Sequence, residues 1–132
     1  MTNQIVFSTR MVWAIQVGQK NQTRRLTDED KYHVGKVYEV HEHYAKGLEP
    51  RPTGILLLVT KKRWEHLQDI CEEDALDEGA IPVGMPRPGP GEEIKMPTEF
   101  FKELWDTIHA PLSPSGWVAN PKVWVIDFRR IR

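Results

Sequence analysis

The apolar and polar positions at the start of the chain predict a short strand followed by a helix. Ile5 to Ser8 has the length and composition of a strand, and apolar residues then recur every three or four positions over residues 9–17. Thr9 stands where its side chain can cap the helix start, and Gly18 stands where a left-handed residue ends a helix. Residues 20–25 are therefore expected to form a loop that leaves the helix.

Three further segments have the pattern of strands. Residues 37–44 follow a turn at Gly35 and Lys36. The apolar run at residues 54–64 is dense enough to predict a strand that is covered on both faces. Residues 120–132 predict a long last strand with two different faces. One face carries Trp124, Ile126 and Phe128, and the other carries Val123 and Val125.

Two helices are expected in the second half of the chain. One covers residues 70–77, with Asp69 and Glu72 at the spacing of a capping box and Gly79 as its stop. The other is amphipathic and starts at Thr98, its expected N-cap. The apolar stripe of this second helix contains Phe101, Leu104, Trp105 and Ile108.

The segment between these two helices has a different composition. Residues 80–97 contain five prolines and three glycines, and such a sequence supports neither a helix nor an inner strand. Loops of this length often act as lids or binding segments. A passive surface insertion is the alternative.

The order of the elements predicts the fold class α+β, mainly β. A strand, a helix and then several strands with short helices between them favour a small β-barrel with short helices at its ends. The length of 132 residues suits one domain with one core. Residues 1–132 are therefore predicted to form a single domain that includes the loop at 80–97.

Composition and charge exclude several classes of protein. The formal net charge is −1, whereas domains held to nucleic acid by bulk charge are strongly basic. The single cysteine, Cys71, excludes a disulfide within the chain and a cysteine-based zinc site. No apolar stretch approaches the roughly 18 residues of a membrane helix, and the first residues lack the pattern of a secretory signal. A cytoplasmic protein without membrane contact is therefore expected.

Any contact with a polyanion must come from a local patch, and the arginines do cluster. Arg24 and Arg25 lie near the start, and Arg129 belongs to a basic C-terminus. If both groups lie at one end of the barrel, their guanidinium groups can bind phosphate through paired hydrogen bonds. The alternative is ordinary ion pairing with the acidic residues of 72–78.

The stretch before Arg25 also contains residue types that can activate a hydroxyl group. Thr23 becomes a nucleophile when a base removes its proton, and Lys20 can be that base if its pKa falls. Burial and the neighbouring arginine charges would both lower the pKa of Lys20. A solvated turn is the alternative, because lysine and threonine three residues apart are common.

Glu78 is a third residue of interest. The helix of residues 70–77 places Cys71, Ala75 and Glu78 on one face. A carboxylate at the edge of a core needs a cation or a hydrogen bond, and Lys20 and the two nearby arginines are candidates. The alternative is a solvated Glu78 on an acidic helix.

Histidine and tryptophan positions raise two other questions. His41 and His43 share one face of a strand, but no third ligand is evident and no metal site is predicted. Five tryptophans raise the question of base stacking. Trp105 and Trp124 fit core stripes, whereas three others are freer to line a pocket: Trp13, Trp64 and Trp117.

The stretch IVFSTRMVWAIQVGQKNQTRR resembles the opening of ASCH-domain proteins, particularly their phage and prophage branch. Those proteins begin with a strand, a short helix and a G-[RQ]-K-x-x-T-x-R loop. The similarity continues through HVGKVYEVHEHY, LQDICEEDALDEGA, FFKELWDTIH and WVANPKVWVIDFRRI, so it is scattered over most of the chain. The sequence departs from the family pattern at Lys36, where the family often has an acid.

The resemblance implies a PUA-like β-barrel whose cleft, beside the glycine–lysine loop, binds RNA or modified nucleotides. One bacterial branch of the family removes the acetyl group from N4-acetylcytidine with a lysine, a threonine three residues later and a glutamate. Carried over by motif, the catalytic residues are Lys20, Thr23 and Glu78. The ligand-binding residues expected with them are Gly18, Arg24, Arg25 and Arg129.

Two functions are therefore predicted as alternatives. The leading one is a module that binds RNA or a modified nucleoside, with a shallow dependence on salt because the protein is nearly neutral. The other is an amidohydrolase that deacylates nucleosides of the N4-acetylcytidine type. A third interpretation is a scaffold or interaction protein that uses the 80–97 loop as its contact. No cofactor is expected, and the chain is expected to be a monomer.

Overall fold

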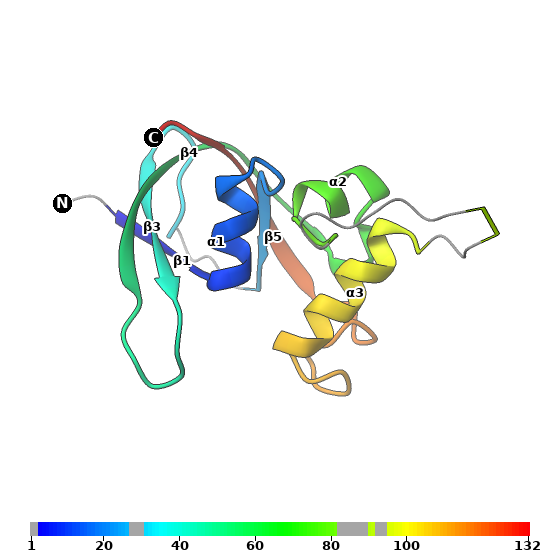
Figure 1. Ribbon diagram of the computed structural model, residues 1–132. Coiled ribbons are helices and arrows are strands. Elements are labelled where there is room, and N and C mark those ends of the chain that lie inside the picture. Colours follow the sequence, from blue (N-terminus) through cyan, green and yellow to red (C-terminus); the bar gives the residue numbers. More distant parts are fainter. Residues whose placement is uncertain (1–2, 27–30, 82–89, 92–94) are drawn as a thin grey trace.

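The structure is a computed structural model that describes residues 3–26, 31–81, 90–91 and 95–132 (Figure 1). Most of its regular structure is strand, which confirms the mainly β, α+β class at this coarse level. No helix among these residues is long and apolar enough to cross a membrane. Its elements in chain order are β1 (Asn3–Ser8), α1 (Thr9–Gln16), β2 (Gln22–Arg25), β3 (Val37–His43), β4 (Arg51–His66), a 3₁₀ turn (Leu67–Asp69), α2 (Glu72–Asp77), α3 (Pro97–Ile108) and β5 (Lys122–Arg130).

The five strands form one curled sheet in the order β1-β3-β4-β5-β2. β1 pairs with β3 in parallel, and the other three pairs are antiparallel. β4 is 16 residues long and bends strongly (Figure 1), with register irregularities next to His41 of its β3 partner and between Val59 and Lys61. The sheet is therefore a half-barrel, and β1 and β2 are its two edges.

α1 connects the two edge strands and differs in detail from the prediction. Ser8, not Thr9, caps the helix, because the Ser8 side chain accepts a hydrogen bond from the Met11 amide at 3.4 Å. Gly18 takes the left-handed conformation expected of it, with φ +80°. The predicted loop at 20–25 is wrong for Gln22–Arg25, which form β2 because they pair with β5. This polar segment has no strand pattern of its own.

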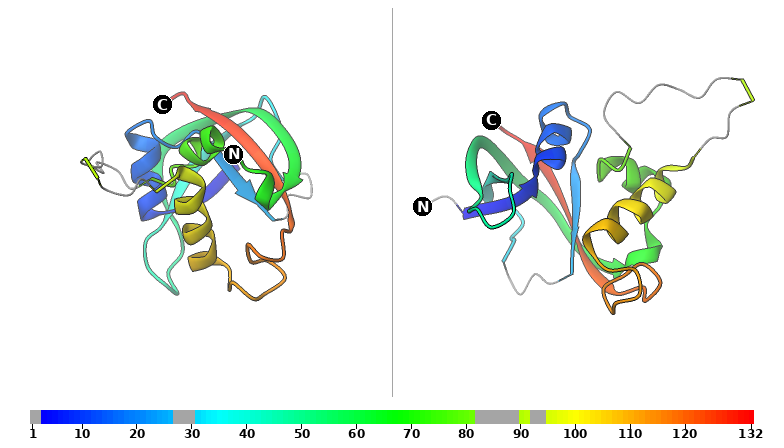
Figure 2. Two further views of the ribbon diagram at one scale, coloured as in Figure 1. Left: turned by 90° about the vertical axis from the view of Figure 1, so that its right-hand side faces the viewer. Right: turned by 60° about the horizontal axis from the view of Figure 1, so that its bottom comes forward.

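β5 separates two apolar cores. Ile126 and Phe128 face the core that α1, β1, β3 and β4 enclose. Val123 and Val125 face the second core, which α2 and α3 cover. Figure 2 shows these two helices side by side next to β5. The two predicted faces of the last strand are confirmed for these four residues, whereas Trp124 is only half-buried.

β4 is not covered on both faces, contrary to prediction. Ile55, Leu57 and Val59 are buried, but they alternate with partly exposed leucines, and residues 60–66 are exposed or partly exposed. The reason is that β4 is longer than the core beneath it, so only one face of its first half meets the interior.

The two later helices begin one or two residues away from the predicted caps. Cys71 caps α2. Asp69, the predicted cap, lies instead at the end of the 3₁₀ turn that precedes the helix. α3 begins at Pro97, whose missing amide hydrogen costs nothing at a first helical position. Thr98 lies inside α3 and donates from its backbone amide to Glu72 of α2 at 3.1 Å. The predicted loop at 80–97 falls mostly on residues 82–89 and 92–94, which lie outside the described residues.

Candidate functional site

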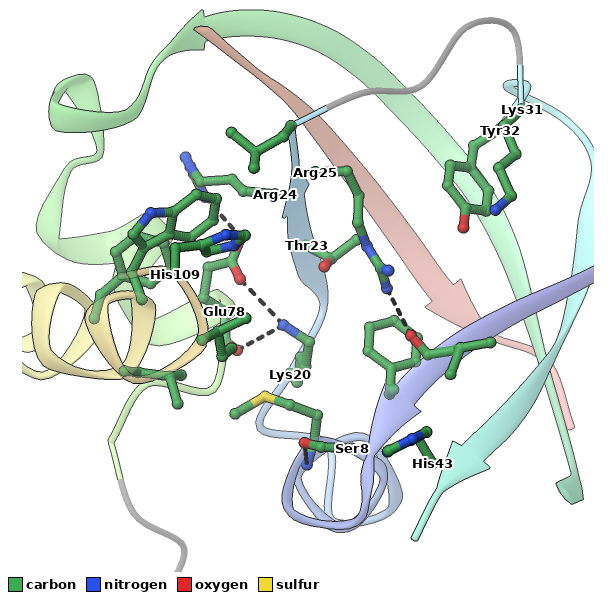
Figure 3. A pocket seen from close by; sticks show the side chains of 18 residues that line it. Ser8, Lys20, Thr23, Arg24, Arg25, Lys31, Tyr32, His43, Glu78 and His109 are labelled. Carbon is green, nitrogen blue, oxygen red and sulfur yellow. Dashed lines mark hydrogen bonds and ion pairs between the residues drawn. The ribbon is translucent and has the colours of Figure 1, made fainter. Parts of the chain in front are cut away.

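A pocket of about 890 Å³ lies between the two edges of the curled sheet (Figure 3). Its walls come from β1, β2, the end of α2 and the apolar face of α3. β2 is an edge strand, so one long side of its backbone is not paired with another strand of the described sheet. The volume is in the range of pockets that enclose small ligands.

Lys20 and Glu78 meet in the wall of this pocket. Lys20 is 3% exposed and Glu78 is 5% exposed. The Lys20 Nζ donates to Glu78 Oε1 at 3.1 Å, to the Glu78 carbonyl at 2.8 Å and to the Gln22 carbonyl at 2.8 Å. All three ammonium protons therefore have an acceptor, and the predicted pairing of Glu78 with a loop cation is observed.

The backbone explains why these two residues lie so close together. Lys20 and Glu78 form an isolated antiparallel bridge, and the next amide, that of Asn21, donates to the Asp77 carbonyl at 2.6 Å. Gly79 follows with φ +75°, and a Cβ atom there would lie 3.1 Å from the Lys20 Cβ. Glycine is thus required by conformation and by close approach.

The environment of Lys20 opposes its charge. Burial lowers the pKa of the Lys20 ammonium below the ordinary 10.5, and the charges of Arg25 and Arg24 act in the same direction. The Glu78 carboxylate acts in the opposite direction but does not cancel the effect of burial. Lys20 is therefore easier to deprotonate than a solvated lysine.

Arg24 is committed to contacts within the protein. Its five N–H groups donate to Glu78 Oε2 at 3.0 Å, twice to Glu65 Oε1, to Asp74 Oδ2 and to the Gln22 side chain. Burial opposes the charge of Arg24, but Glu78 and Glu65 outweigh it and raise the pKa of the guanidinium. The geometry favours the ion-pairing alternative for Arg24 over phosphate binding.

Arg25 lies on the opposite face of β2 and has different surroundings. Its Nη2 donates to the Val6 carbonyl of β1 at 2.9 Å, and its guanidinium lies 5.0 Å from the Phe7 ring centroid and 6.0 Å from that of Tyr32. No acidic residue within the described ranges forms an ion pair with it. Burial lowers the pKa of Arg25, against the opposing influence of Tyr32 and Glu78. The guanidinium therefore carries a cation into the pocket, and no carboxylate of the described residues is paired with it.

Thr23 stands between these groups in the wall of the same pocket. Its side chain is buried, and its hydroxyl lies beside Lys20 and Arg25 in Figure 3. Within the part of the chain that the structure describes, the hydroxyl makes no hydrogen bond, including to Lys20. The structure thus brings Lys20 and Glu78 into contact and leaves Thr23 available to a ligand.

Two predicted ligand-binding residues lie elsewhere. Gly18 is an exposed turn residue that does not line the pocket. Arg129 is exposed near the end of β5, where it pairs with Leu58 of β4. The neighbouring Arg130 donates to the Gln16 carbonyl at the end of α1. The C-terminal arginines therefore do not join Arg24 and Arg25 in one basic mouth at the pocket.

α3 contributes a wall that sequence reasoning assigned to the core. Trp105 stacks on His109 with ring centroids 4.2 Å apart, and both line the pocket with Phe101. The Trp105 Nε1 is held by the Ser115 carbonyl at 2.8 Å. Burial lowers the pKa of His109, and Asp106 acts in the opposite direction. The sequence contained one sign of this wall: the apolar stripe of α3 continues past Trp105 to His109, a polar residue.

The two histidines that share a face of β3 have different surroundings. His41 contacts Glu39 at 3.2 Å, and His43 lines the pocket separately. Across residues 3–26, 31–81, 90–91 and 95–132, no three side chains of histidine, cysteine, aspartate or glutamate gather as metal ligands.

Comparison of the chain with protein-family models, with curated proteins and with solved structures gives no match. The family resemblance therefore stays a prediction.

Proposed function

We propose that the protein is an ASCH domain of PUA-like fold that hydrolyses the N-acyl group of a nucleoside-sized substrate, of the N4-acetylcytidine type. The observation that carries this proposal is the buried Lys20 ammonium, held by Glu78 in the wall of a pocket that also contains the Thr23 hydroxyl. The family resemblance supports it, because its motif selects the same three residues.

The reaction begins when neutral Lys20 accepts the proton of the Thr23 hydroxyl as its oxygen attacks the acyl carbon. A tetrahedral intermediate forms, and Lys20 returns the proton to the departing amine as the C–N bond breaks. Water then hydrolyses the threonine ester and releases the carboxylic acid. Glu78 positions the Lys20 nitrogen throughout, through the contact of 3.1 Å.

Two hydrogen-bond donors are available to the oxyanion of the proposed intermediate. Arg25 is the charged one, because its guanidinium extends into the pocket beside Thr23. The second is the backbone amide of Arg24. The Phe128 amide donates to the Asn21 carbonyl, so by alternation the amides of Gln22 and Arg24 face away from β5, toward the unpaired edge.

Within the pocket, the distribution of cations favours one nucleoside-sized group over several phosphates. Arg24 is neutralised by three carboxylates, and Arg129 lies outside the pocket. The α3 wall, with Trp105 and His109, offers instead an aromatic surface of the kind that holds a planar base.

Release of acetate from N4-acetylcytidine tests the proposal. Turnover is expected in the native protein and is expected to fall at least about a hundredfold in Thr23→Ala and Lys20→Met, because the nucleophile or its base is lost. Thr60→Ala is the matched control, since Thr60 is exposed on β4. Turnover that survives both pocket substitutions contradicts the assignment.

One observation favours a second function, binding without turnover. The three Lys20 protons are all donated, an arrangement suited to a permanent ammonium ion. In that case a modified nucleoside binds through Arg25 and the α3 wall, and no acid is released. Calorimetric titration with N4-acetylcytidine and cytidine then gives the same affinities for native protein and Thr23→Ala.

A further inference from the structure

Two tryptophans lie next to each other on the sheet, outside the pocket. Trp64 of β4 and Trp124 of β5 are directly opposite in the strand register. Trp64 is 52% exposed, and Trp124 is half-buried. Directly opposed residues share one face of a sheet, so the two indole rings form one aromatic surface. Such a surface is unusual on a strand pair that meets only water.

Cationic side chains surround this aromatic surface. The Lys122 Nζ lies 4.5 Å from the Trp64 ring centroid and 5.5 Å from that of Trp124. The Lys62 Nζ lies 5.1 Å from the Trp124 ring centroid. The two acids of these strands are directed elsewhere: Glu65 pairs with Arg24, and Asp127 accepts from Gln22. Within these two strands, the tryptophan face therefore carries cations and no carboxylate.

The aromatic surface continues toward the pocket. Trp124 is directly opposite Arg25 of β2, as well as opposite Trp64 of β4. Arg25, Trp124 and Trp64 therefore form one row across three neighbouring strands. Two interstrand spacings set the length of that row at about 10 Å. A chain molecule lying on the tryptophans thus reaches the cation at the pocket wall within a short distance.

We infer that Trp64, Trp124 and Lys122 form a binding platform for single-stranded nucleic acid. Unpaired bases stack on the indole rings regardless of sequence, and Lys122 contacts a phosphate beside them. One further step rests on the proposed function: the strand continues past Arg25 and places one nucleotide in the pocket. The substrate is then an acylated nucleotide within a strand and not only a free nucleoside.

Anisotropy of labelled oligonucleotides of about ten nucleotides tests the platform, with single-stranded RNA, single-stranded DNA and duplex DNA as separate arms. Both single strands, or RNA alone, are expected to bind more tightly than the duplex, because only unpaired bases stack. Affinity is expected to fall with salt by a slope near −1 to −2, since few phosphates are contacted. Equal affinity for duplex and single strands overturns the inference, as does the absence of binding.

Substitutions locate the binding surface. Trp64→Ala is expected to weaken single-strand binding by about tenfold, and Trp124→Ala by a similar factor. Trp13→Ala is the matched control, because Trp13 is 53% exposed on α1, away from the platform. Since Trp124 is partly buried, Trp64→Ala and Lys122→Gln provide the decisive comparison if Trp124→Ala does not fold. Equal losses in Trp13→Ala and Trp64→Ala overturn the inference.

Two substitutions distinguish failure of the platform inference from failure of the proposed pocket chemistry. Trp64→Ala is expected to lower turnover of an acetylated oligonucleotide while turnover of free N4-acetylcytidine stays unchanged. Thr23→Ala is expected to abolish turnover while oligonucleotide binding stays within about twofold of native. Loss of strand binding in Thr23→Ala, with no loss in Trp64→Ala, places the strand in the pocket alone and contradicts the platform.

Discussion

Lys20 and Arg24 are buried in the same region, but the surroundings disfavour the charged form of Lys20 and favour that of Arg24. Burial and the arginine charges work against the Lys20 ammonium, and Glu78 alone favours it. Arg24 has three carboxylates within hydrogen-bonding distance, and they outweigh its burial. Lys20 is therefore the residue of this pair that can exchange a proton, and Arg24 is a fixed charge.

Glu78→Gln tests the balance of charges at Lys20. Because the Glu78 carboxylate raises the pKa of Lys20, its removal is expected to lower that pKa further below 10.5. Arg25→Gln removes a charge that lowers the pKa, so the pKa is expected to rise. NMR titration of the Lys20 side chain measures both shifts without reference to activity. Shifts in the same direction for the two variants would contradict this account.

The lowered pKa also sets how stability depends on pH. Between the pKa of Lys20 in the folded protein and 10.5, the unfolded chain binds more protons than the folded one. The contribution of Lys20 therefore increases stability as pH rises through that interval. In Lys20→Met this contribution is absent, so the denaturation midpoint of the native protein is expected to rise relative to that of Lys20→Met as pH rises through the interval.

Arg24→Gln is expected to destabilise the fold by about 3–5 kcal/mol, because it leaves the Glu78 carboxylate buried without one of its cations. Arg63→Gln is a matched control: Arg63 pairs with the same Asp74 as Arg24, at 2.9 Å, but its side chain is 43% exposed. Its loss is expected to cost less than about 1 kcal/mol. Urea denaturation compares the two. Equal costs would mean that the buried charges do not depend on Arg24.

At the scale of elements, the end of α2 positions the carboxylate. α2 ends at Asp77, and Glu78 is its C-cap. Gly79 then turns the chain in the left-handed conformation, and Glu78 lies against Lys20. Gly79→Ala is expected to lower the free energy of unfolding more than Gly47→Ala does. Both glycines have positive φ, but a Cβ at residue 79 meets two other Cβ atoms and one at residue 47 meets nothing within 4 Å.

Strain from positive φ costs about 1–2 kcal/mol at either position. The difference between the two variants in thermal denaturation therefore measures the close approach alone. A shift in the Lys20 side-chain resonances is expected in Gly79→Ala and not in Gly47→Ala. Identical behaviour of the two variants would show that Glu78 does not depend on this contact.

The elements with long periodic patterns were the easiest to predict from the sequence. β4, β5 and α3 repeat apolar residues over many positions, so their pattern is visible without a partner. β2 could not be predicted, because Gln-Thr-Arg-Arg becomes a strand only through pairing with β5. The candidate site residues could be selected from their chemistry. The contact of Lys20 with Glu78 could not be predicted, because it depends on the backbone bridge between two segments far apart in sequence and on the turn at Gly79. The α3 wall was missed because a core stripe and a pocket wall have the same period.

At the scale of the whole molecule, β5 joins the two cores. Its residues alternate between them, so loss of packing on one side withdraws support from the other. Val125→Ala, in the core under α2 and α3, is expected to cost about 2 kcal/mol. Tryptophan fluorescence and far-ultraviolet circular dichroism are expected to give one coincident transition in this variant and in the native protein. Two separated transitions would mean that the cores unfold independently.

The two edges of the half-barrel meet without a strand ladder. Among the described residues, the Arg25 side chain supplies the hydrogen bond that joins β2 to β1, at the Val6 carbonyl. A ligand anion that binds the Arg25 guanidinium competes with the Val6 carbonyl for it. The gap between β1 and β2 can then widen while every strand pair of the sheet stays intact. Binding would loosen one border of the sheet, and amide hydrogens along the outer side of β1 are expected to exchange with deuterium faster in the complex than in the free protein.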